Sequence, residues 1–533
     1  MKIIKKTINQ TILSSAISLL LTASNLYAAD HEAKETQKAH EGVNAHKLFE
    51  ENCASCHGSD HGGFIAPALN AATLKGRSPT ALRTIIMTGS FDTLMPPFYG
   101  KLSDTEIRAL VQHLQTTPKL PNPAWTINDM KASLKIYADE SKLPAKPTYQ
   151  LGSLDDLIGV AARGKYGRGE GSKAVFINSK THQKIGEIKT GTAAHIIDYN
   201  PVNQRWAYIK TDTAEIFKVD LYTMQAVRSI KTGYNGPGLG VSRDGKYIMA
   251  GSFVPHNAVI LDANTLEPLK TFELEGVDPD GKMVSSDSGM IIGTPFADIF
   301  AIALENAGQV WVVDLKGDFP VTKITDVGRH LHDAFLTHKG RKLMIAAYDD
   351  SKVTAIDLQE RKIIKKLDAG CVPHLGGGAA VKVDGRTLGF GTNFGSCDKT
   401  VVSVWDLDKM EVVKQIPVLG GTESPAAHAN APYVAVDIIS KDRRARAVQL
   451  IDKKTLEVVK TLDVGGHAYF PEYSADGKFL YISAGYSGDE VVVYDSVSLK
   501  KVASIPMESP AGIFSHGRVK YMTRGLLPDE MVK

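Results

Sequence analysis

Near the amino terminus, residues 53–57 read Cys-Ala-Ser-Cys-His and so combine two thiols with an imidazole. Two cysteines one helical turn apart can add to the vinyl groups of a haem, and the adjacent histidine can bind its iron. Redox-active Cys-x-x-Cys pairs without haem also exist, but the helix-compatible residues before this motif agree with haem attachment. The pattern predicts a covalent haem c, attached through Cys53 and Cys56, with His57 as an iron ligand.

A second iron ligand is expected some tens of residues later, because haem c iron is commonly bound by a methionine in a proline-containing loop. Met95 lies in the sequence Thr-Leu-Met-Pro-Pro-Phe and fits this description. Met87 is the competing candidate, but its apolar neighbours indicate the buried face of a helix. We therefore expect Met95 to bind the iron, and such Met/His ligation favours electron transfer over catalysis at this haem.

The segment after this loop predicts a closing amphipathic helix. Ser103 and Glu106 have the spacing of a capping box. Apolar residues then recur at helical spacing at Ile107, Leu110, Val111 and Leu114. A helix of this kind resembles the last helix of class I cytochromes c, so residues 29–118 are predicted to form a small all-α cytochrome c domain.

Length and composition predict an exported protein with more than one domain. The chain has 533 residues, of which 43% are apolar and 23% charged, so two or more cores are expected. Residues 1–28 resemble a secretory signal peptide, with a basic start and the apolar stretch 12–21. That stretch is too short for a membrane span. Removal of the signal peptide with its three lysines leaves a net charge of about 0, so no nucleic-acid partner is expected. The mature protein is assigned to the periplasm.

The two remaining cysteines, Cys371 and Cys397, lie outside the haem motif. An oxidising compartment allows them to form a disulfide. Two separate buried thiols are the alternative, and the sequence leaves both open.

Prolines bracket residues 119–149, which we interpret as a connector containing one short helix. From residue 150 to residue 533 the chain repeats a unit made of a β-run, an acidic or amide turn and a second β-run. The turn residues of the eight copies are Asn178, Asp220, Asp262, Asp314, Asp357, Asp406, Asp452 and Asp495. Repeats of 42 to 52 residues with several short strands are typical of propeller blades. Eight copies predict an all-β, eight-bladed propeller.

Four histidines fall at nearly the same point of this repeat. His195 lies 17 residues after its turn residue, His332 18, His374 17 and His467 15. In a propeller this point marks the start of the innermost strand, so we expect four imidazoles to point towards one central space. A lone histidine in a β-domain is usually structural, whereas a convergent set suits a metal ion or a metallated macrocycle. Zinc is one option, but the haem c motif favours a second redox centre.

At these residues the chain resembles the cytochrome cd1 family, in which a haem c domain precedes an eight-bladed propeller that holds haem d1. The sequence Gly-Thr-Ala-Ala-His-Ile, ending at Ile196, resembles the segment with the proximal ligand, which implies that His195 binds the d1 iron. The sequences Arg-His-Leu-His-Asp and Val-Pro-His-Leu-Gly-Gly-Gly resemble the segments that carry two distal histidines, here His332 and His374.

The resemblance implies the reduction of nitrite to nitric oxide at haem d1. His332 and His374 would be catalytic, because two imidazolium groups can hold the anion and protonate its departing oxygen. Electrons would enter through haem c from a small periplasmic cytochrome c or cupredoxin. The resemblance also implies a homodimer.

Several positions depart from the reductase pattern. The arginines that hold the haem d1 carboxylates are not evident, and Arg163, Lys210 and Arg243 are the substitutes that we suggest. The sequence Glu-Ser-Pro-Ala-Gly-Ile-Phe near the carboxyl terminus resembles relatives in haem d1 biosynthesis. These include dihydro-haem d1 dehydrogenase, which converts a propionate to an acrylate and in which His467 would be a candidate base. A solvated histidine at the start of a strand is the alternative for His467. A non-catalytic haem d1-binding protein and an interaction propeller complete the alternatives for the whole chain.

Overall fold

The computed structural model describes residues 43–63, 66, 68–88, 95, 98–118, 124–164, 171–394, 400–439, 446–466, 468–485 and 488–517. The predicted signal peptide lies outside these residues. Two compact units are present: one is drawn from residues up to 119, and the other comprises residues 120–533 together with 55–68 and 91–94. Among the described helices, none has the length and apolar character that a membrane span needs.

The described residues before 119 form helices. These are α2 (Ala45–Asn52), α3 (Ala54–His57), α4 (Pro79–Thr88) and α5 (Asp104–Thr116). The capping box is present, because the Ser103 hydroxyl accepts the Glu106 N–H and the Glu106 carboxylate accepts the Ser103 N–H. The four apolar residues that predicted α5 are all buried, and they pack against Phe49 of α2 in one core. The predicted helical cytochrome c domain is therefore confirmed.

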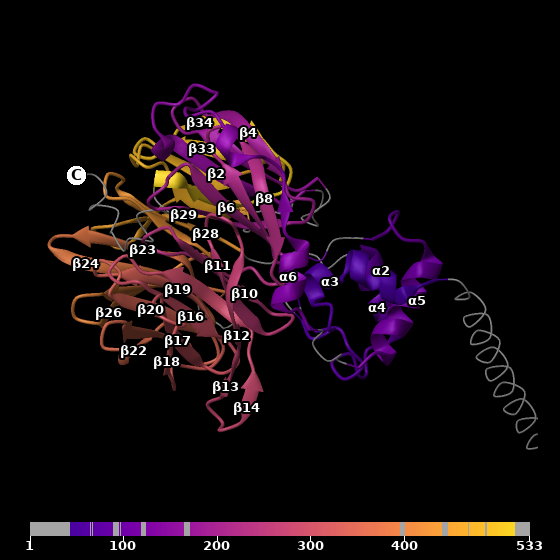
Figure 1. Cartoon of the computed structure of the whole chain (residues 1–533). Helices are drawn as coiled ribbons and strands as arrows, with labels where there is room; N and C mark the ends of the chain where they lie inside the picture. Colours follow the sequence, from indigo (N-terminus) through magenta and orange to yellow (C-terminus); the bar gives the residue numbers. More distant parts are fainter. Residues whose placement is uncertain are drawn as a thin grey trace, which may run out of the picture. The chain divides into compact units, whose positions relative to one another are not determined.

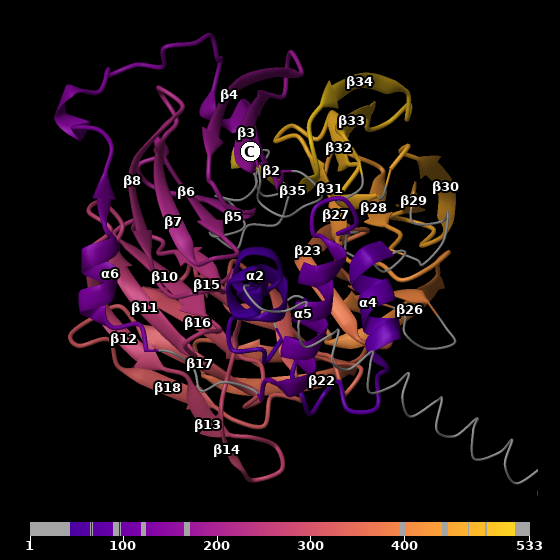
Figure 2. The ribbon, with the colours of Figure 1, turned by 90° about the vertical axis from the view of Figure 1, so that its right-hand side faces the viewer.

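Within the described residues, eight antiparallel sheets stand around a central axis as the blades of a propeller (Figure 1, Figure 2). Blade 1 contains β35 (Pro510–Ser515), β2 (Leu157–Ala162), β3 (Lys173–Asn178) and β4 (Gln183–Lys189). Blade 2 contains β5 (Ala194–Tyr199), β6 (Trp206–Thr211), β7 (Glu215–Asp220) and β8 (Gln225–Lys231). Blade 3 contains β9 (Leu239–Val241), β10 (Tyr247–Ser252), β11 (Asn257–Asp262) and β12 (Pro268–Glu273). Blade 4 contains β15 (Ser288–Gly293), β16 (Ile299–Leu304), β17 (Gln309–Asp314) and β18 (Val321–Ile324).

The second half of the ring repeats this arrangement. Blade 5 contains β19 (Leu331–Thr337), β20 (Lys342–Ala347), β21 (Lys352–Asp357) and β22 (Lys362–Asp368). Blade 6 contains β23 (Pro373–Val383), β24 (Arg386–Asn393), β25 (Val401–Asp406) and β26 (Glu411–Pro417). Blade 7 contains β27 (Pro425–Ala427), β28 (Tyr433–Asp437), β29 (Ala447–Asp452) and β30 (Val458–Asp463). Blade 8 contains β31 (Tyr469–Tyr473), β32 (Phe479–Ser483), β33 (Glu490–Asp495) and β34 (Lys501–Pro506). The predicted eight-bladed propeller is confirmed.

The repeated turn residue accepts a local backbone hydrogen bond in seven of the eight described outer hairpins, whereas the Asp314 carboxylate pairs with Arg361. Asp262 Oδ1 accepts the N–H groups of Asn264 and Thr265, both at 2.8 Å, which is the way in which aspartate stabilises a tight turn. The same pair of bonds recurs at Asp357, Asp406, Asp452 and Asp495. An extra hairpin of β13 (Glu275–Val277) and β14 (Met283–Ser285) lengthens the repeat between blades 3 and 4.

Neighbouring blades share apolar cores, and the chain ends close the ring. Blades 4 and 5 enclose one cluster in which Ala301, Val312 and Ile345 are fully buried. The carboxyl-terminal strand β35 pairs with β2 and so completes blade 1. Cys371, just before β23, is disulfide-bonded, whereas Cys397 lies outside the described residues.

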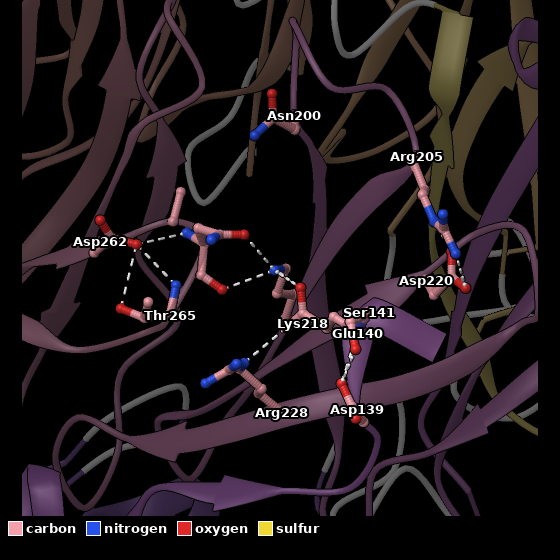
Figure 3. Close-up of polar contacts among 12 residues, drawn as sticks. Asp139, Glu140, Ser141, Asn200, Arg205, Lys218, Asp220, Arg228, Asp262 and Thr265 are labelled. Carbon is pink, nitrogen blue, oxygen red and sulfur yellow. Dashed lines mark hydrogen bonds and ion pairs between the residues drawn. The ribbon is translucent and has the colours of Figure 1, made fainter. Parts of the chain in front are cut away.

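The connector between residues 124 and 149 packs on blade 2. It forms α6 (Ile127–Ser133), β1 (Lys135–Ile136) and the 3₁₀ turn η1 (Glu140–Lys142), and β1 pairs with β8. Glu140 accepts one hydrogen bond from Lys218 Nζ and one from Arg228 Nε, each at 2.7 Å (Figure 3). The Lys218 side chain is fully buried. Burial lowers the pKa of Lys218, and Glu140 opposes that shift.

We expect the Glu140→Ala variant to lower the free energy of unfolding by about 3 kcal/mol, because it leaves the buried Lys218 ammonium without its carboxylate. Urea unfolding at pH 7 measures this change. Glu187→Ala is the matched control, since the side chains of its ion pair with Lys173 are 43% and 30% exposed and such surface pairs contribute less than about 1 kcal/mol. Equal losses in the two variants would contradict the prediction.

Candidate functional site

The histidines singled out by the repeat spacing lie at the starts of innermost strands. His195 is the second residue of β5, His332 of β19 and His374 of β23. The strand register shifts at or beside each of them, between Ala194 and Ile196, between Leu331 and Ala334, and between His374 and Ala379. Such bulges turn a side chain out of the regular alternation and are common at active sites. His467 lies outside the described residues.

His195 is held by a buried carboxylate. Its Nδ1 lies 2.7 Å from Oδ1 of Asp212, the residue directly after β6. Arg163 forms an ion pair with the same carboxylate, and both side chains are 1% exposed. Burial alone would raise the pKa of Asp212, but Arg163 and His195 hold it below its ordinary value. Asp212 is therefore an anion that accepts the proton of His195 Nδ1.

This hydrogen bond leaves His195 with the chemistry of a metal ligand. When Nδ1 donates to a carboxylate, Nε2 keeps its lone pair, and the ring orientation is fixed. The His195 side chain is 29% exposed, whereas its partners are sealed from solvent. His195 Nε2 could therefore bind a metal ion, such as the iron of a haem.

His332 and His374 meet across the gap between blades 5 and 6, with ring centroids 5.5 Å apart. Asp333 bridges them, since its Oδ1 is 2.8 Å from His332 Nδ1 and its Oδ2 is 2.8 Å from His374 Nε2. His374 Nδ1 lies 2.8 Å from the backbone carbonyl oxygen of Glu423. Because both nitrogens of His374 face acceptors, both carry protons here, and the ring is an imidazolium.

Electrostatics keep this pair charged. Burial alone would lower the pKa of His332, but Asp333 and Glu305 raise it to about 9. The pKa of His374 is also raised, because the attraction of Asp333 outweighs burial. Burial would raise the pKa of Asp333, yet the two imidazoles hold it well below its ordinary value. The result is a buried anion between two cations.

Further carboxyl groups surround the pair. Glu305 Oε1 lies 3.7 Å from His332 Nε2, and burial raises the pKa of Glu305 to about 8. Burial raises the pKa of Glu423 to about 7, and its Oε1 accepts a hydrogen bond from Tyr469 Oη at 2.7 Å. Asp437 accepts the N–H groups of Glu423 and Ser424. A carboxyl group with a pKa near 7 can accept a proton at physiological pH.

The three suggested carboxylate-binding side chains each have intramolecular partners. Arg163 pairs with Asp212 as described. Lys210 is fully buried; its Nζ donates to the backbone carbonyl oxygens of Gly238 and Gly251, and burial lowers its pKa to about 7. Arg243 lies in the turn between β9 and β10 and pairs with Asp298 at 2.5 Å. Arg163 thus contacts the site through Asp212 and His195, and the role of the three in binding carboxylates remains a prediction.

The haem c residues are placed by the helices of the small domain. Cys53 follows α2, and Cys56 and His57 belong to α3. Cys53 and Met95 pack against the core that includes Phe49, and His57 is 8% exposed. Two thiols, an imidazole and a thioether are the donors that a covalent haem c needs. Met87 packs against the same core, so the choice of Met95 as the second ligand remains a prediction.

Sequence reasoning missed the carboxylates of this site. Asp212 lies two residues after Lys210, and Asp333 directly follows His332, so both carboxylates are beside residues that the sequence singled out. Glu423 lies 17 residues after the turn residue Asp406, which is the spacing that identified the histidines. Counting acids as well as imidazoles at that point of the repeat would have found it. Glu305 follows β16 and has no such signal.

The Glu305→Gln variant is expected to become more stable than the wild type as the pH rises. The folded pKa of Glu305 is about 8 and its ordinary value is 4.5, so folding retains a proton that the unfolded chain has lost. This penalty is absent below pH 4.5 and grows between pH 4.5 and 8, by on the order of 1.4 kcal/mol per pH unit. Urea unfolding at pH 4.5 and 8 measures the difference, and a constant difference between the two proteins would contradict the assignment.

Two family matches cover most of the chain. Residues 166–519 match the family described as cytochrome D1 heme domain. Residues 41–114 match the family described as cytochrome C oxidase, cbb3-type, subunit III. The first match covers the propeller and the second covers the helices with the Cys-x-x-Cys-His motif.

Individual relatives match over long stretches of the chain. Dihydro-heme d1 dehydrogenase of Pseudomonas aeruginosa is 26% identical over 476 residues, which cover 88% of this chain and 93% of the relative. Nitrite reductase of Stutzerimonas stutzeri is 25% identical over 389 residues, which cover 69% of this chain and 67% of that protein. The solved structure of dihydro-heme d1 dehydrogenase NirN in complex with DHE has a TM-score of 0.72 at 26% identity and covers 90% of this chain and all of its own. The similarity to the dehydrogenase thus extends further along both chains than the similarity to the reductase.

Proposed function

The chain belongs to the cytochrome D1 heme domain family, and we propose that within this family it is a dihydro-haem d1 dehydrogenase. Its reaction is the oxidation of a propionate side chain of the tetrapyrrole to an acrylate. This proposal replaces nitrite reduction, which the sequence motifs favoured, as the first assignment. The greater extent of similarity to the dehydrogenase supports the change.

The observation that carries this proposal is the excess of acids around the two central imidazoles. The carboxyl groups are Glu305, Asp333, Glu423 and Asp437. Both N–H groups of His374 are bonded to protein acceptors, and one N–H of His332 is bonded to Asp333. The two N–H groups of His374 are thus not free to bind nitrite, whereas Glu423, with a pKa of about 7, can accept a proton near neutral pH. Such a site favours proton removal over proton delivery.

Oxidation of a propionate to an acrylate removes two hydrogen atoms as two protons and two electrons. Glu423 is suited to accept a proton, because its pKa is about 7 and Tyr469 orients its carboxylate. His467, the base that the sequence suggests for this reading, lies outside the described residues. The electrons would be carried by the bound haem groups, which supply one-electron redox chemistry.

The residues that would hold those groups are on both units. His195, oriented by Asp212, would bind the iron of the tetrapyrrole through Nε2. Cys53, Cys56 and His57 would hold haem c, with Met95 as its second iron ligand. The haem c domain would pass electrons to a small periplasmic cytochrome c or cupredoxin, which acts here as the acceptor.

Nitrite reduction is the second candidate, and one observation favours it. His332 and His374 lie 5.5 Å apart, and both are held as cations, as a pair of distal proton donors requires. In that function the haem c domain would deliver electrons from the same class of periplasmic partner.

One experiment separates the two functions. The full-length protein with its haem c is incubated without oxygen with dihydro-haem d1 and an oxidised cytochrome c. We expect mass spectrometry to show a tetrapyrrole that has lost two hydrogens, together with reduction of the cytochrome. In parallel, the protein loaded with haem d1 receives nitrite and a reductant, and nitric oxide is measured. Nitric oxide formation without oxidation of dihydro-haem d1 would reject the dehydrogenase assignment.

A further inference from the structure

Two buried polar atoms beside His332 have no hydrogen-bond partner among the described residues. They are Oη of Tyr348, whose residue is 8% exposed, and Oε1 of Glu305, whose residue is 6% exposed. Buried polar groups in folded proteins are almost always bonded, because an unmade hydrogen bond costs the full desolvation of the group. Two such atoms at one site indicate that a ligand completes them.

Both residues lie beside the His332 ring, Tyr348 on its plane and Glu305 near its Nε2. The Tyr348 ring stacks on His332 with centroids 5.0 Å apart and an interplanar angle of 9°. Glu305 Oε1 lies 3.7 Å from His332 Nε2, the ring nitrogen on the side opposite to Asp333. That distance is too long for a hydrogen bond. His332 Nε2, Tyr348 Oη and the Glu305 carboxyl group therefore form a cluster of polar groups that the protein itself does not satisfy.

We propose that these three groups form a subsite for a carboxylate, namely that of the side chain oxidised in the proposed reaction. This inference rests on the proposed function. The Tyr348 hydroxyl and His332 Nε2 each donate to the carboxylate, and the Glu305 carboxyl group donates a third hydrogen bond.

The chemistry of the three groups selects an oxyanion. His332 is held as a cation by Asp333, and the tyrosine is a neutral donor because burial raises its pKa well above the ordinary value. Glu305 has a pKa of about 8 and so keeps its proton near neutral pH. A carboxylate offers lone pairs to several donors at once, whereas an apolar side chain would leave all three unsatisfied. Recognition of the carboxylate would place the neighbouring carbon atoms beside the acids that accept protons.

The test compares Tyr348→Phe with a matched control, Tyr208→Phe. Tyr208 is also buried, but its hydroxyl donates to the carbonyl oxygen of Ala263 at 2.9 Å, away from this cluster. Binding of dihydro-haem d1 to the full-length protein is followed by its visible absorption. The loss of one hydrogen bond to a charged group should weaken binding by roughly 10- to 100-fold in Tyr348→Phe. Tyr208→Phe should bind as the wild type does. In the free protein, thermal unfolding should show a lower melting temperature for Tyr208→Phe and little change for Tyr348→Phe, because only Tyr208 loses a hydrogen bond there.

A second ligand identifies the group that is recognised. The same tetrapyrrole with methylated side-chain carboxylates should bind equally weakly to the wild type and to Tyr348→Phe. Glu305→Leu removes the third donor, so it should also weaken binding of the free acid, by roughly 10-fold. Two results would overturn a subsite for the side-chain carboxylate. One is that Tyr348→Phe binds the free acid as tightly as the wild type does; the other is that it weakens binding of the methyl ester as much as binding of the free acid.

Nitrite is the alternative source of the same oxyanion chemistry. It is added to the protein loaded with haem d1, and its binding is followed by visible absorption. Weaker nitrite binding in Tyr348→Phe, with no difference between the tetrapyrrole acid and its ester, would retain the subsite but assign it to a free anion. That result would count against the dehydrogenase rather than against the subsite. If neither ligand responds to Tyr348→Phe, the subsite itself is rejected.

Discussion

Replacement of His195 by glycine is expected to weaken the binding of a d1-type haem by about 100-fold or more and to shift its visible absorption bands. In the proposed site His195 Nε2 would bind the iron, because Nδ1 is engaged by Asp212. Equilibrium titration of the full-length protein with haem d1 measures the affinity, and the same spectra report the ligation of the iron. Added imidazole should restore both in His195→Gly, because it can fill the space that the side chain vacates.

Two further variants show whether the effect comes from iron ligation. Asp212→Asn keeps the shape of the pair but removes the charge that fixes the imidazole, and we expect a loss of about 10- to 100-fold in affinity. His182→Gln is the control, since His182 lies in the turn after β3 and contacts Tyr481. Normal spectra and affinity in His195→Gly would show that the iron is bound elsewhere.

The repeated part of the fold was predictable because one local interaction recurs. Most of the outer hairpins contain an aspartate or asparagine that accepts the N–H groups following it, as at Asp262. That bond requires a particular residue type at a fixed place, so it leaves a periodic trace in the sequence. The histidine positions follow from the same period, since chain length from the turn to the innermost strand hardly varies. His195, His332 and His374 were therefore placed correctly along their strands.

Apart from Glu423, the remainder of the site depends on contacts between blades, which leave no period. Asp333 joins a histidine of its own blade to one of the next, and Glu305 approaches from a turn two strands earlier. Bulges then re-aim the side chains, and a bulge is not visible as a motif. Arg163 illustrates the limit: its charge suggested a partner for substrate carboxylates, but the fold pairs it with Asp212.

These contacts also separate two enzymes that share one domain order. A haem c motif and a histidine-bearing propeller are common to both candidate functions and so do not decide between them. The sequence favoured nitrite reduction because of the segments that carry His332 and His374. The proposed dehydrogenase function rests on the buried carboxyl groups, because one of them can accept a proton near neutral pH. Glu423 is the member of this set whose pKa, about 7, best matches a base at neutral pH.

The Glu423→Gln variant is therefore expected to slow oxidation of dihydro-haem d1 by about 100-fold or more while leaving its binding unchanged. The wild-type rate should rise with pH through about 7, because Glu423 accepts a proton only after losing its own, and this limb should be absent in the variant. Steady-state rates from pH 5 to 9 measure it. The pKa of Glu305 is about 8, so a second change in rate near pH 8 would belong to Glu305. Only the rise around pH 7, the lower limb of the profile, is assigned to Glu423.

The hydrogen bond from Tyr469 provides an independent test of that assignment. It favours the ionised form of Glu423, so Tyr469→Phe should raise the pKa of Glu423 and move the lower limb to higher pH without abolishing it. Tyr473→Phe is the matched control, because Tyr473 lies on the same strand and donates instead to the carbonyl oxygen of Tyr433. A limb that stays near pH 7 in both Glu423→Gln and Tyr469→Phe would assign the base to another residue. A limb that moves only in Tyr469→Phe and disappears only in Glu423→Gln requires the proton to be accepted at the Glu423 carboxylate.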